Sequence, residues 1–335
     1  MDRFVKSATQ RGIQELHLDA TGDRYLLHPC LLRCKSLRQL SLSSCRFNEM
    51  LLPSIIPYIK ELRLHSMHLS DLLQSLLSKC VSLETLHISP GTCPFVGSIN
   101  SPNLHKFVWK TTKEDELIIK DAPNLESLVL DVYTARDCKV KVLDAPKLQL
   151  LGMLHMNFKA LQLGETFFDR QTTPGFVVKA MPCQMKTLSS VKTLGIKLSL
   201  TFNETIPDLL RCFPCLENFY IMNYETCISG RYSKKVMWDE QGSLDFLDHL
   251  ETVTMKGFHG DKRDAELLRY LVINGKVLKR VTLLCSKSKP ITEHFVKNIR
   301  WQLGFKNRAS IDLELMFFAD TERCHEFSLW NQVIQ

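Results

Sequence analysis

The sequence predicts an α/β solenoid, a fold in which short strands from successive repeats line up side by side. Three observations predict it: a turn motif that occurs three times, a constant spacing between copies, and an apolar pattern that suits a one-sided strand. The motif is Ser/Ala-Pro-Asn/Lys-Leu, and its copies begin at Ser101, Ala122 and Ala145. A short strand with one apolar face cannot bury that face alone, whereas stacked copies can.

Each copy leads into a segment of the form apolar-x-x-apolar-x-apolar. The leading leucines Leu104, Leu125 and Leu148 lie 21 and 23 residues apart. Four earlier segments share the pattern, and all successive intervals lie between 21 and 24 residues; these segments start at Ile13, Leu37, Ile59 and Leu83. Repeats of about 20–29 residues with this pattern are typical of leucine-rich repeats. We therefore expect a leucine-rich-repeat solenoid with a curved, mostly parallel sheet.

The segments between the strands differ along the chain. Residues 70–79 carry leucines at helical spacing, with Ser70 or Asp71 as the N-cap, and predict a helix. The prolines of the three turn motifs disfavour a helical residue before them. Between those turns we expect extended returns, with short strands at 117–119 and 140–142.

The pattern becomes irregular at about 164–190, where residues 171–175 read as a loop. A strand led by Phe158 precedes this stretch, and repeats resume at Val191 and Leu216, with a helix capped by Thr205 between them. Residues 224–242 are polar and predict a long exposed loop.

The C-terminal part alternates strands and helices. Strands are predicted from Leu250, Leu278 and Ile311, and helices at 264–274 and 292–303, closed by Gly275 and Gly304. Such a segment suits the end of a solenoid, where a capping unit covers the open core. We therefore divide the chain into a leucine-rich-repeat region, residues 1–241, and a C-terminal α/β cap, residues 242–335.

Composition limits the class of protein. The chain has 335 residues, of which 44% are hydrophobic and 24% charged, and a net charge of +7. No apolar run reaches the roughly 18 residues of a membrane span, and the N-terminus does not resemble a signal peptide. We therefore expect no membrane association, a cytoplasmic or nuclear location, and twelve cysteines that are mostly free buried thiols rather than disulfides. The modest positive charge does not predict nucleic-acid binding.

No residue pattern predicts catalysis, a metal or a cofactor. Cys212-x-x-Cys215 and Cys30-x-x-x-Cys34 do not form a complete set of four zinc ligands. His17, His65 and His87 alternate with the apolar strand positions, which predicts solvated histidines on the outward face, and no nucleophile or carboxylate pair accompanies them. We expect a protein that is not an enzyme.

The outward face of the strands is the candidate binding surface. Residues two apart on a strand share a face, so the pattern predicts two outward columns. The first contains Arg63, His87, Val108 and Val129, and the second contains His65, Lys110, Asp131, Leu154 and Lys197. Exposed apolar residues among them, Val108, Val129 and Leu154, suit a protein-binding patch; alternatively, neighbouring loops cover them. The candidate partner-binding residues are Arg63, His65, His87, Val108, Lys110, Val129, Asp131 and Leu154.

The order of several weak motifs resembles that of plant F-box proteins with leucine-rich repeats. The segments are Arg11-Gly12-Ile13-Gln14-Glu15-Leu16, residues 34–42 and 76–84, the three turn motifs, and Cys212-Phe213-Pro214-Cys215-Leu216-Glu217. Residues 242–317 resemble the FBD domain that closes many such chains, with Gly257-Phe258-His259-Gly260 at the centre of the match. No stretch of the sequence resembles the F-box itself, so we expect either a lost module or a fragment.

This resemblance implies a non-enzymatic module similar to the substrate-binding part of an F-box-type ubiquitin-ligase receptor. The partner would be a target protein that the sequence does not identify. The cullin-ligase adaptor would bind only if an F-box lies upstream. The alternative is a stand-alone leucine-rich-repeat interaction or scaffold protein without a ubiquitin-ligase role.

Overall fold

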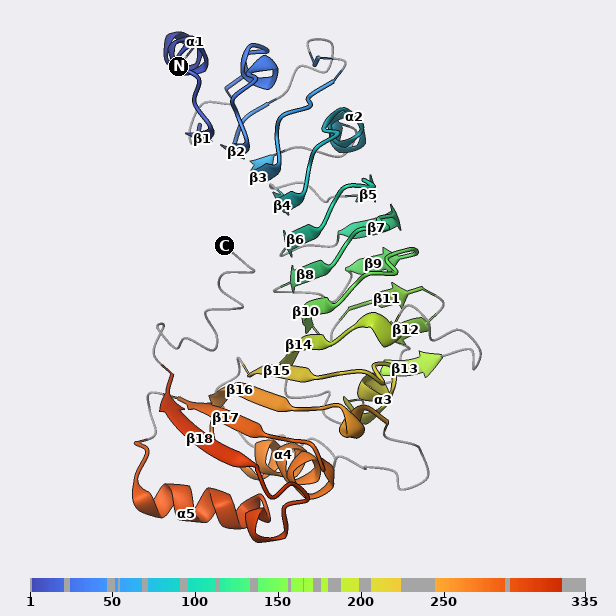
Figure 1. The fold of residues 1–335 in the computed structure, drawn as a ribbon, viewed down its shortest axis with the longest axis vertical. Coiled ribbons are helices and arrows are strands. Elements are labelled where there is room, and N and C mark those ends of the chain that lie inside the picture. The colour runs from blue at the N-terminus through green and yellow to red at the C-terminus, as the bar shows by residue number, and fades with distance from the viewer. Residues whose placement is uncertain are drawn as a thin grey trace. The chain divides into compact units, whose positions relative to one another are not determined.

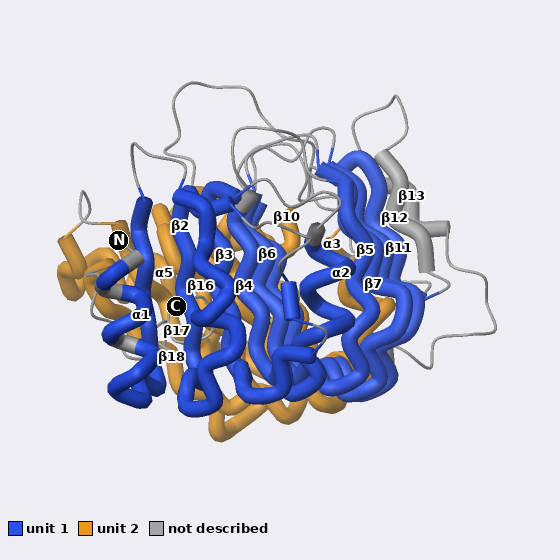
Figure 2. The backbone as a smooth tube through the Cα atoms, turned by 90° about the horizontal axis from the view of Figure 1, so that it is seen from above, with its two compact units in different colours: residues 1–148, 158–165 blue, residues 149–157, 166–335 orange. Residues whose placement is uncertain are grey.

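The computed structural model describes residues 2–20, 25–46, 52–53, 55–67, 72–90, 96–111, 115–132, 138–155, 158–164, 166–170, 176–179, 188–198, 206–223, 245–286 and 290–320. The chain divides into two compact units (Figure 2). Unit 1 comprises residues 1–148 and 158–165, and unit 2 comprises residues 149–157 and 166–335. The predicted domain boundary between residues 241 and 242 lies outside the described residues and stays a prediction.

Unit 1 is built on a parallel sheet (Figure 1). Each of its strands begins two residues after a leading apolar residue of the repeat. Its strands, in spatial order, are β1 (Glu15–Asp19), β2 (Gln39–Ser43), β3 (Glu61–Met67), β4 (Thr85–Pro90), β6 (Lys106–Thr111) and β8 (Ser127–Val132). The α/β leucine-rich-repeat solenoid predicted from the spacing is confirmed.

The return segments of unit 1 lie on one side of this sheet (Figure 1). They are α1 (Asp2–Gln10), the 3-10 turn η1 (Leu31–Arg33) and α2 (Leu72–Lys79), followed by the strands β5 (Val96–Asn100), β7 (Glu116–Asp121), β9 (Lys139–Val142) and β11 (Ala160–Leu163), which form a second parallel sheet. The predicted change from a helical to an extended return is confirmed. The sequence analysis missed α1 and β5, and the proposed caps Ser70 and Asp71 lie outside the described residues.

The turn motif works through its backbone. The N–H of the leading leucine donates to the carbonyl three residues earlier, from Leu104 to Ser101 at 3.2 Å and from Leu125 to Ala122 at 3.0 Å. Side chains then join one turn to the next: Asn124 Nδ2 donates to the Pro102 carbonyl at 2.8 Å. Asn103 makes the equivalent bond to the Val81 carbonyl at 2.7 Å. The side chain of the motif's asparagine therefore hydrogen-bonds to the backbone of the preceding repeat. The sequence pattern did not predict this contact.

A second backbone link joins neighbouring strands at their entrance. The carbonyl of Lys60 accepts hydrogen bonds from the N–H groups of both Glu84 and Thr85, at 2.8 and 2.9 Å. In unit 2 the carbonyl of Glu217 does the same for Glu251 and Thr252, at 2.8 and 3.1 Å. One carbonyl thus sets the start of the next strand in both units.

Unit 2 contains a parallel sheet of β10 (Leu150–His155), β14 (Thr193–Leu198), β15 (Asn218–Asn223), β16 (Thr252–Phe258), β17 (Arg280–Cys285) and β18 (Glu314–Ala319). The stretch predicted to be irregular contains β12 (Thr166–Arg170) and β13 (Phe176–Lys179), which pair antiparallel. An antiparallel pair is not a copy of the parallel repeat, and for this reason the repeat pattern fails there. The predicted loops at 171–175 and 224–242 and the cap Thr205 lie outside the described residues.

The remaining elements of unit 2 are η4 (Leu188–Ser190), α3 (Ile206–Arg211), η6 (Asp245–Asp248), α4 (Lys262–Asn274), α5 (Glu293–Gln302) and η7 (Phe305–Asn307). Side-chain caps explain where the two longer helices begin: Asp261 accepts from Asp264 N at 2.9 Å and Thr292 from Phe295 N at 3.1 Å. The predicted order of strands and helices at the C-terminal end is confirmed. Ile311, predicted in the last strand, precedes β18 and is 86% exposed. None of the helices in the described parts of the chain is long and apolar enough to cross a membrane.

The repeat leucines form the core. Leu128 of β8 is fully buried, whereas the neighbouring Ser127 points to the other face, and its hydroxyl has no hydrogen-bond partner among the residues that the structure describes. We predict that Leu128→Ala lowers the free energy of unfolding by about 2–5 kcal/mol, and that Ser127→Ala changes it by less than about 0.5 kcal/mol. Urea unfolding of the two variants measures both values, and equal losses would contradict the assigned strand register.

Gly257 is held in a conformation that other residues rarely adopt. Its φ is 71°, and a Cβ atom would lie 2.2 Å from the carbonyl oxygen of Asn223. Gly304 has a similar φ of 62°, but its Cβ would meet the flexible tip of Ile273 at 3.2 Å. We predict that Gly304→Ala costs about 1–2 kcal/mol of stability, the left-handed backbone term, and that Gly257→Ala costs more because a backbone atom must move. Thermal melts of the two variants compare the losses of stability. A smaller loss for Gly257→Ala than for Gly304→Ala would contradict the close packing of Gly257 against the Asn223 carbonyl.

Candidate protein-interaction face

The parallel register places the outward side chains of unit 1 in straight columns. One column runs through His17, Ser41, Arg63, His87, Val108 and Val129, as the sequence predicted. The column before it runs through Glu15, Gln39, Glu61, Thr85, Lys106 and Ser127. The column after it contains Asp19, Ser43 and His65, and pairs Lys110 with Asp131. We call these three columns the outer strand face.

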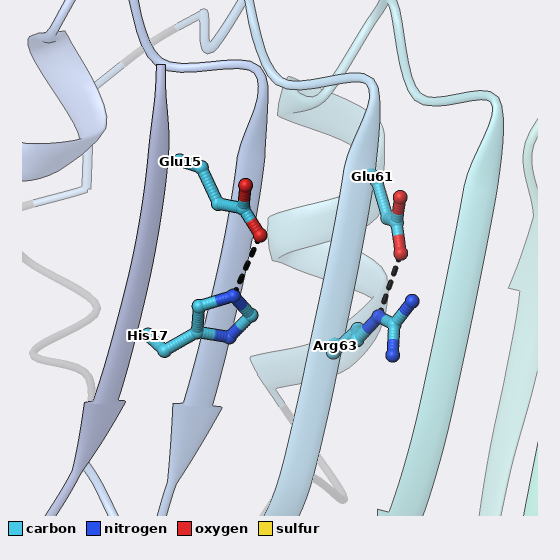
Figure 3. Close-up of polar contacts among 4 residues, drawn as sticks. All are labelled: Glu15, His17, Glu61 and Arg63. Atoms are coloured by element: carbon cyan, nitrogen blue, oxygen red, sulfur yellow. Dashed lines mark hydrogen bonds and ion pairs between the residues drawn. The ribbon is translucent and has the colours of Figure 1, made fainter. Parts of the chain in front are cut away.

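Acidic residues hold two of the basic side chains on this face (Figure 3). On β1, Oε1 of Glu15 lies 2.7 Å from Nε2 of His17, and both side chains are well exposed. On β3, Nε of Arg63 donates to Oε1 of Glu61 at 2.6 Å, with only 34% and 20% of the two side chains exposed. Both pairs join residues two apart on one strand, which share a face. The half-buried pair fixes the direction of the Arg63 guanidinium.

His87 is the centre of a cationic group on β3, β4 and β6. Burial, the largest cause, and the nearby Arg63, Lys106, Lys110 and His65 together lower the pKa of His87 to about 3. The imidazole is 4% exposed, and its Nε2 has no hydrogen-bond partner among the described residues. The prediction of a solvated histidine is therefore wrong at this position. His87 is neutral at physiological pH because a proton there would be both desolvated and close to other positive charges.

Two further groups show the same electrostatics. Burial, Lys110 and Arg63 together lower the pKa of His65. Burial also lowers the pKa of Lys106, where nearby Glu61 acts in the opposite direction. His65 on β3 and Lys110 on β6 are half-exposed, whereas His87, on the strand between them, is buried.

The apolar candidates are not exposed. Val108 and Val129 are fully covered, and Asp131 is 5% exposed. The sequence left two interpretations open for Val108 and Val129: an exposed apolar patch, or positions that other residues cover. The structure shows that they are covered, so the exposed patch is a wrong prediction at these two residues. The residues of the face that remain accessible are polar or charged, so charge rather than apolar area is the property it offers to a partner.

Leu154 does not occupy the position that the alternating pattern predicts. The register of β10 and β14 shifts between Leu151 and Leu154, so that Leu154 pairs with Ile196 and His155 pairs with Lys197. The cause is a bulge in which Met153 has a φ of 58°, and Leu154 is buried. His155 takes the outward position instead, and burial and Lys197 lower its pKa to about 4. The glycine at position 152 was the one feature of the sequence that could have predicted this bulge, since a glycine inside a strand often marks one.

The cysteines and histidines do not assemble into a metal site in the parts of the chain that the structure describes. Eight of the cysteines are described, all as free thiols, and six of them are buried. Burial raises the pKa of the Cys80 thiol to about 12, which keeps the thiol protonated. Cys212 is buried and Cys215 is partly exposed. Cys212 and Cys215 thus serve the packing around α3.

The low pKa of His87 makes the stability of the fold depend on pH. An unfolded histidine takes up a proton below pH 6.5, whereas folded His87 does so only near pH 3. The unfolded state therefore binds more protons across this interval, and the contribution of His87 to stability is lost as the pH falls. We predict that His87→Gln flattens the decline in unfolding free energy between about pH 7 and pH 5, by at most about 1.4 kcal/mol per pH unit. Urea unfolding at several pH values measures it, and identical slopes for both proteins would contradict the buried neutral state.

The sequence matches two family models. Residues 1–221 match the leucine-rich repeats described for FBD-associated F-box protein At5g56370, and residues 246–283 match the FBD domain. The F-box/FBD/LRR-repeat protein At1g13570 of Arabidopsis thaliana is 24% identical over 300 residues, which are 86% of this chain and 70% of that protein. The putative F-box/LRR-repeat protein At3g58920 of the same plant is 35% identical over 234 residues, 63% of this chain and 50% of that protein. The chain belongs to the plant F-box/FBD/leucine-rich-repeat family.

Proposed function

We propose that this chain recognises a target protein through the outer strand face of unit 1, without catalysing a reaction itself. The family supports a protein-interaction role, because the matched models and relatives are named for repeats and F-box association. The chain would then act as the substrate-binding part of an F-box-type ubiquitin-ligase receptor, in the cytoplasm or the nucleus.

The observation that carries the proposal is the cationic group around His87. Arg63, His65 and Lys110 present positive or protonatable groups from two strands within one half-buried area. Glu61 neutralises Arg63, but Lys110 takes part in no ion pair among the described residues. His87 is neutral and adds no charge, so the attraction for a carboxylate of a partner comes from Arg63 and Lys110. Charge-assisted bonds to arginine and lysine are among the stronger polar contacts in an interface.

The alternative is a stand-alone leucine-rich-repeat interaction or scaffold protein. It uses the same face and the same residues, so binding of a target does not separate the two functions. Association with subunits of a cullin ligase does separate them.

Substitution of the accessible residues tests the binding face. We predict that the triple variant Arg63→Ala, His65→Ala and Lys110→Ala binds a target found by proximity labelling at least about tenfold more weakly, since a few residues usually carry most of an interface's affinity. His87 is left unchanged because its substitution would test packing rather than contact.

A matched control removes three exposed basic groups outside the face: Lys60→Ala, His105→Ala and Lys147→Ala. Their ion pairs and hydrogen bonds lie at the exposed entrances of the strands and contribute little to stability. The control should bind within about twofold of the unchanged protein. Equal weakening of both triple variants, at unchanged melting temperature, would contradict the assignment of the face.

The link to a ligase is tested with a purified Skp-type adaptor. We expect residues 1–335 alone not to retain the adaptor, because no stretch of this sequence resembles an F-box. Co-purification of cullin-ligase subunits with the chain from plant cells would support the receptor function, and its absence alongside a bound target would support the scaffold function. Direct stoichiometric binding of the purified adaptor would show a docking element elsewhere in these residues.

A further inference from the structure

The C-terminal end of unit 2 carries a surface that the proposed function does not use. It lies on α5, η7 and the loop that leads to β18 (Figure 1). The inner side of α5 accounts for the folding of this region: Ile299 and Leu303 are fully buried, and Phe295 packs edge-on against Phe258 and Phe317 at 6.5 and 6.3 Å. These contacts hold α5 in place without help from its outer side.

Two large apolar side chains on the outer side have no role in this packing. Trp301, two residues after Ile299 and on the opposite side of the helix, is 79% exposed, and Ile311 is 86% exposed. Single exposed apolar residues are common on proteins. These two, however, lie on segments that are held together by contacts among Arg300, Phe305 and Arg308, and the same segments carry several positive charges.

Phe305 links the end of α5 to the loop that carries Ile311. The guanidinium groups of Arg300 and Arg308 both lie over its ring, 5.2 and 4.9 Å from the ring centre. These distances are within the range of cation–π attraction. Arg308 also donates hydrogen bonds to the carbonyls of Phe305 and Ile311, each at 3.4 Å. The loop that presents Ile311 is thereby fastened beside the end of the helix that presents Trp301.

The charge of this area is one-sided. Arg269 of α4 reaches the same place, since its Nε would lie 3.7 Å from a Cβ atom on Gly304, and Lys306 is exposed on η7. Residues 299–313 contain one carboxylate, Asp312. Within the described chain, Arg269, Arg300, Lys306 and Arg308 form no ion pair with any carboxylate. We call the surface of Arg269, Arg300, Trp301, Lys306, Arg308 and Ile311 the Trp301 patch.

We propose that the Trp301 patch binds an acidic segment of another protein that also carries an aromatic or large aliphatic residue. Tryptophan and arginine are the residues most enriched at the centres of protein interfaces. Unpaired guanidinium groups match carboxylates in geometry and charge. A nucleic acid would satisfy the cations and stack on Trp301, but its phosphates would gain nothing from Ile311. This proposal uses none of the residues of the outer strand face, so a test of one surface does not decide the other.

A phage-displayed library of random peptides, selected on the immobilised full chain, tests the proposal without a known partner. The peptides that are enriched should be acidic and should contain an aromatic or aliphatic residue. A labelled copy of the most enriched peptide should bind about tenfold more weakly to Arg300→Glu and to Trp301→Ser. Its affinity should also fall as the salt concentration rises.

Two controls in the same unit match these substitutions. Lys262→Glu reverses a charge on α4 at a side chain that is 91% exposed, and Val277→Ser removes a partly exposed apolar side chain outside the patch. Both should bind the peptide within about twofold of the unchanged chain. Melting temperatures show that each variant is folded.

Three results would overturn the proposal. The first is a selection that enriches no acidic peptides over the unselected library. The second is a loss of binding as large in Lys262→Glu or Val277→Ser as in the patch variants. The third is binding of short DNA or RNA probes that depends on Arg300 but not on Ile311 and displaces the peptide, which would make the patch a nucleic-acid site.

Discussion

The fold depends on one backbone carbonyl at the entrance of each strand, which accepts hydrogen bonds from the N–H group of the first residue of the next strand and from that of the residue before it. In unit 1 this holds for the carbonyls of Gln14, Arg38, Lys60, Glu84 and His105, and in unit 2 for Gln149, Lys192, Glu217 and Glu251. The link uses no side chain, so it sets the spacing of the strands whatever residues follow. A return segment can then be a helix, as α2 is, or a strand, as β7 is, without disturbing the sheet.

The exit of the strand is less uniform than its entrance. Ser66, Met153 and Gly257 have positive φ values near the ends of β3, β10 and β16, and the register shifts at each place. A bulge adds one residue to one strand of a pair, so every later side chain changes face. An alternating sequence pattern contains no record of the extra residue unless a glycine stands there. This explains why His155, and not Leu154, faces outward.

The sequence predicts most of the strands because their leucines repeat, and it predicts the two longer helices of unit 2 because their apolar residues recur at helical spacing and a glycine follows each of them. It does not predict α1 or the β12–β13 hairpin, which are not copies of the repeat. The same limit applies to the outer strand face. Alternation shows that Arg63, His87 and Val108 share a column, since that depends on register alone. Their exposure depends on what lies over the face, and no local pattern reports that His87 and Val108 are covered.

The charged groups of this chain fall into two kinds, and the difference bears on function. At the strand entrances, Lys60–Glu84, Lys192–Glu217 and Lys279–Glu251 are matched pairs with both partners about half-exposed or more, at 2.6 to 2.7 Å. Such pairs contribute about 0–1 kcal/mol each and are complete without a partner molecule. The groups around His87 are different, because burial and nearby positive charges lower the pKa values of His65, His87 and Lys106, even though Glu61 lies close to Arg63 and raises the pKa of Lys106. Positive charges held together where water is partly excluded raise the free energy of the isolated fold, and a carboxylate that approaches them lowers it. For this electrostatic reason we propose the outer strand face, and not the strand entrances, as the surface that binds a partner.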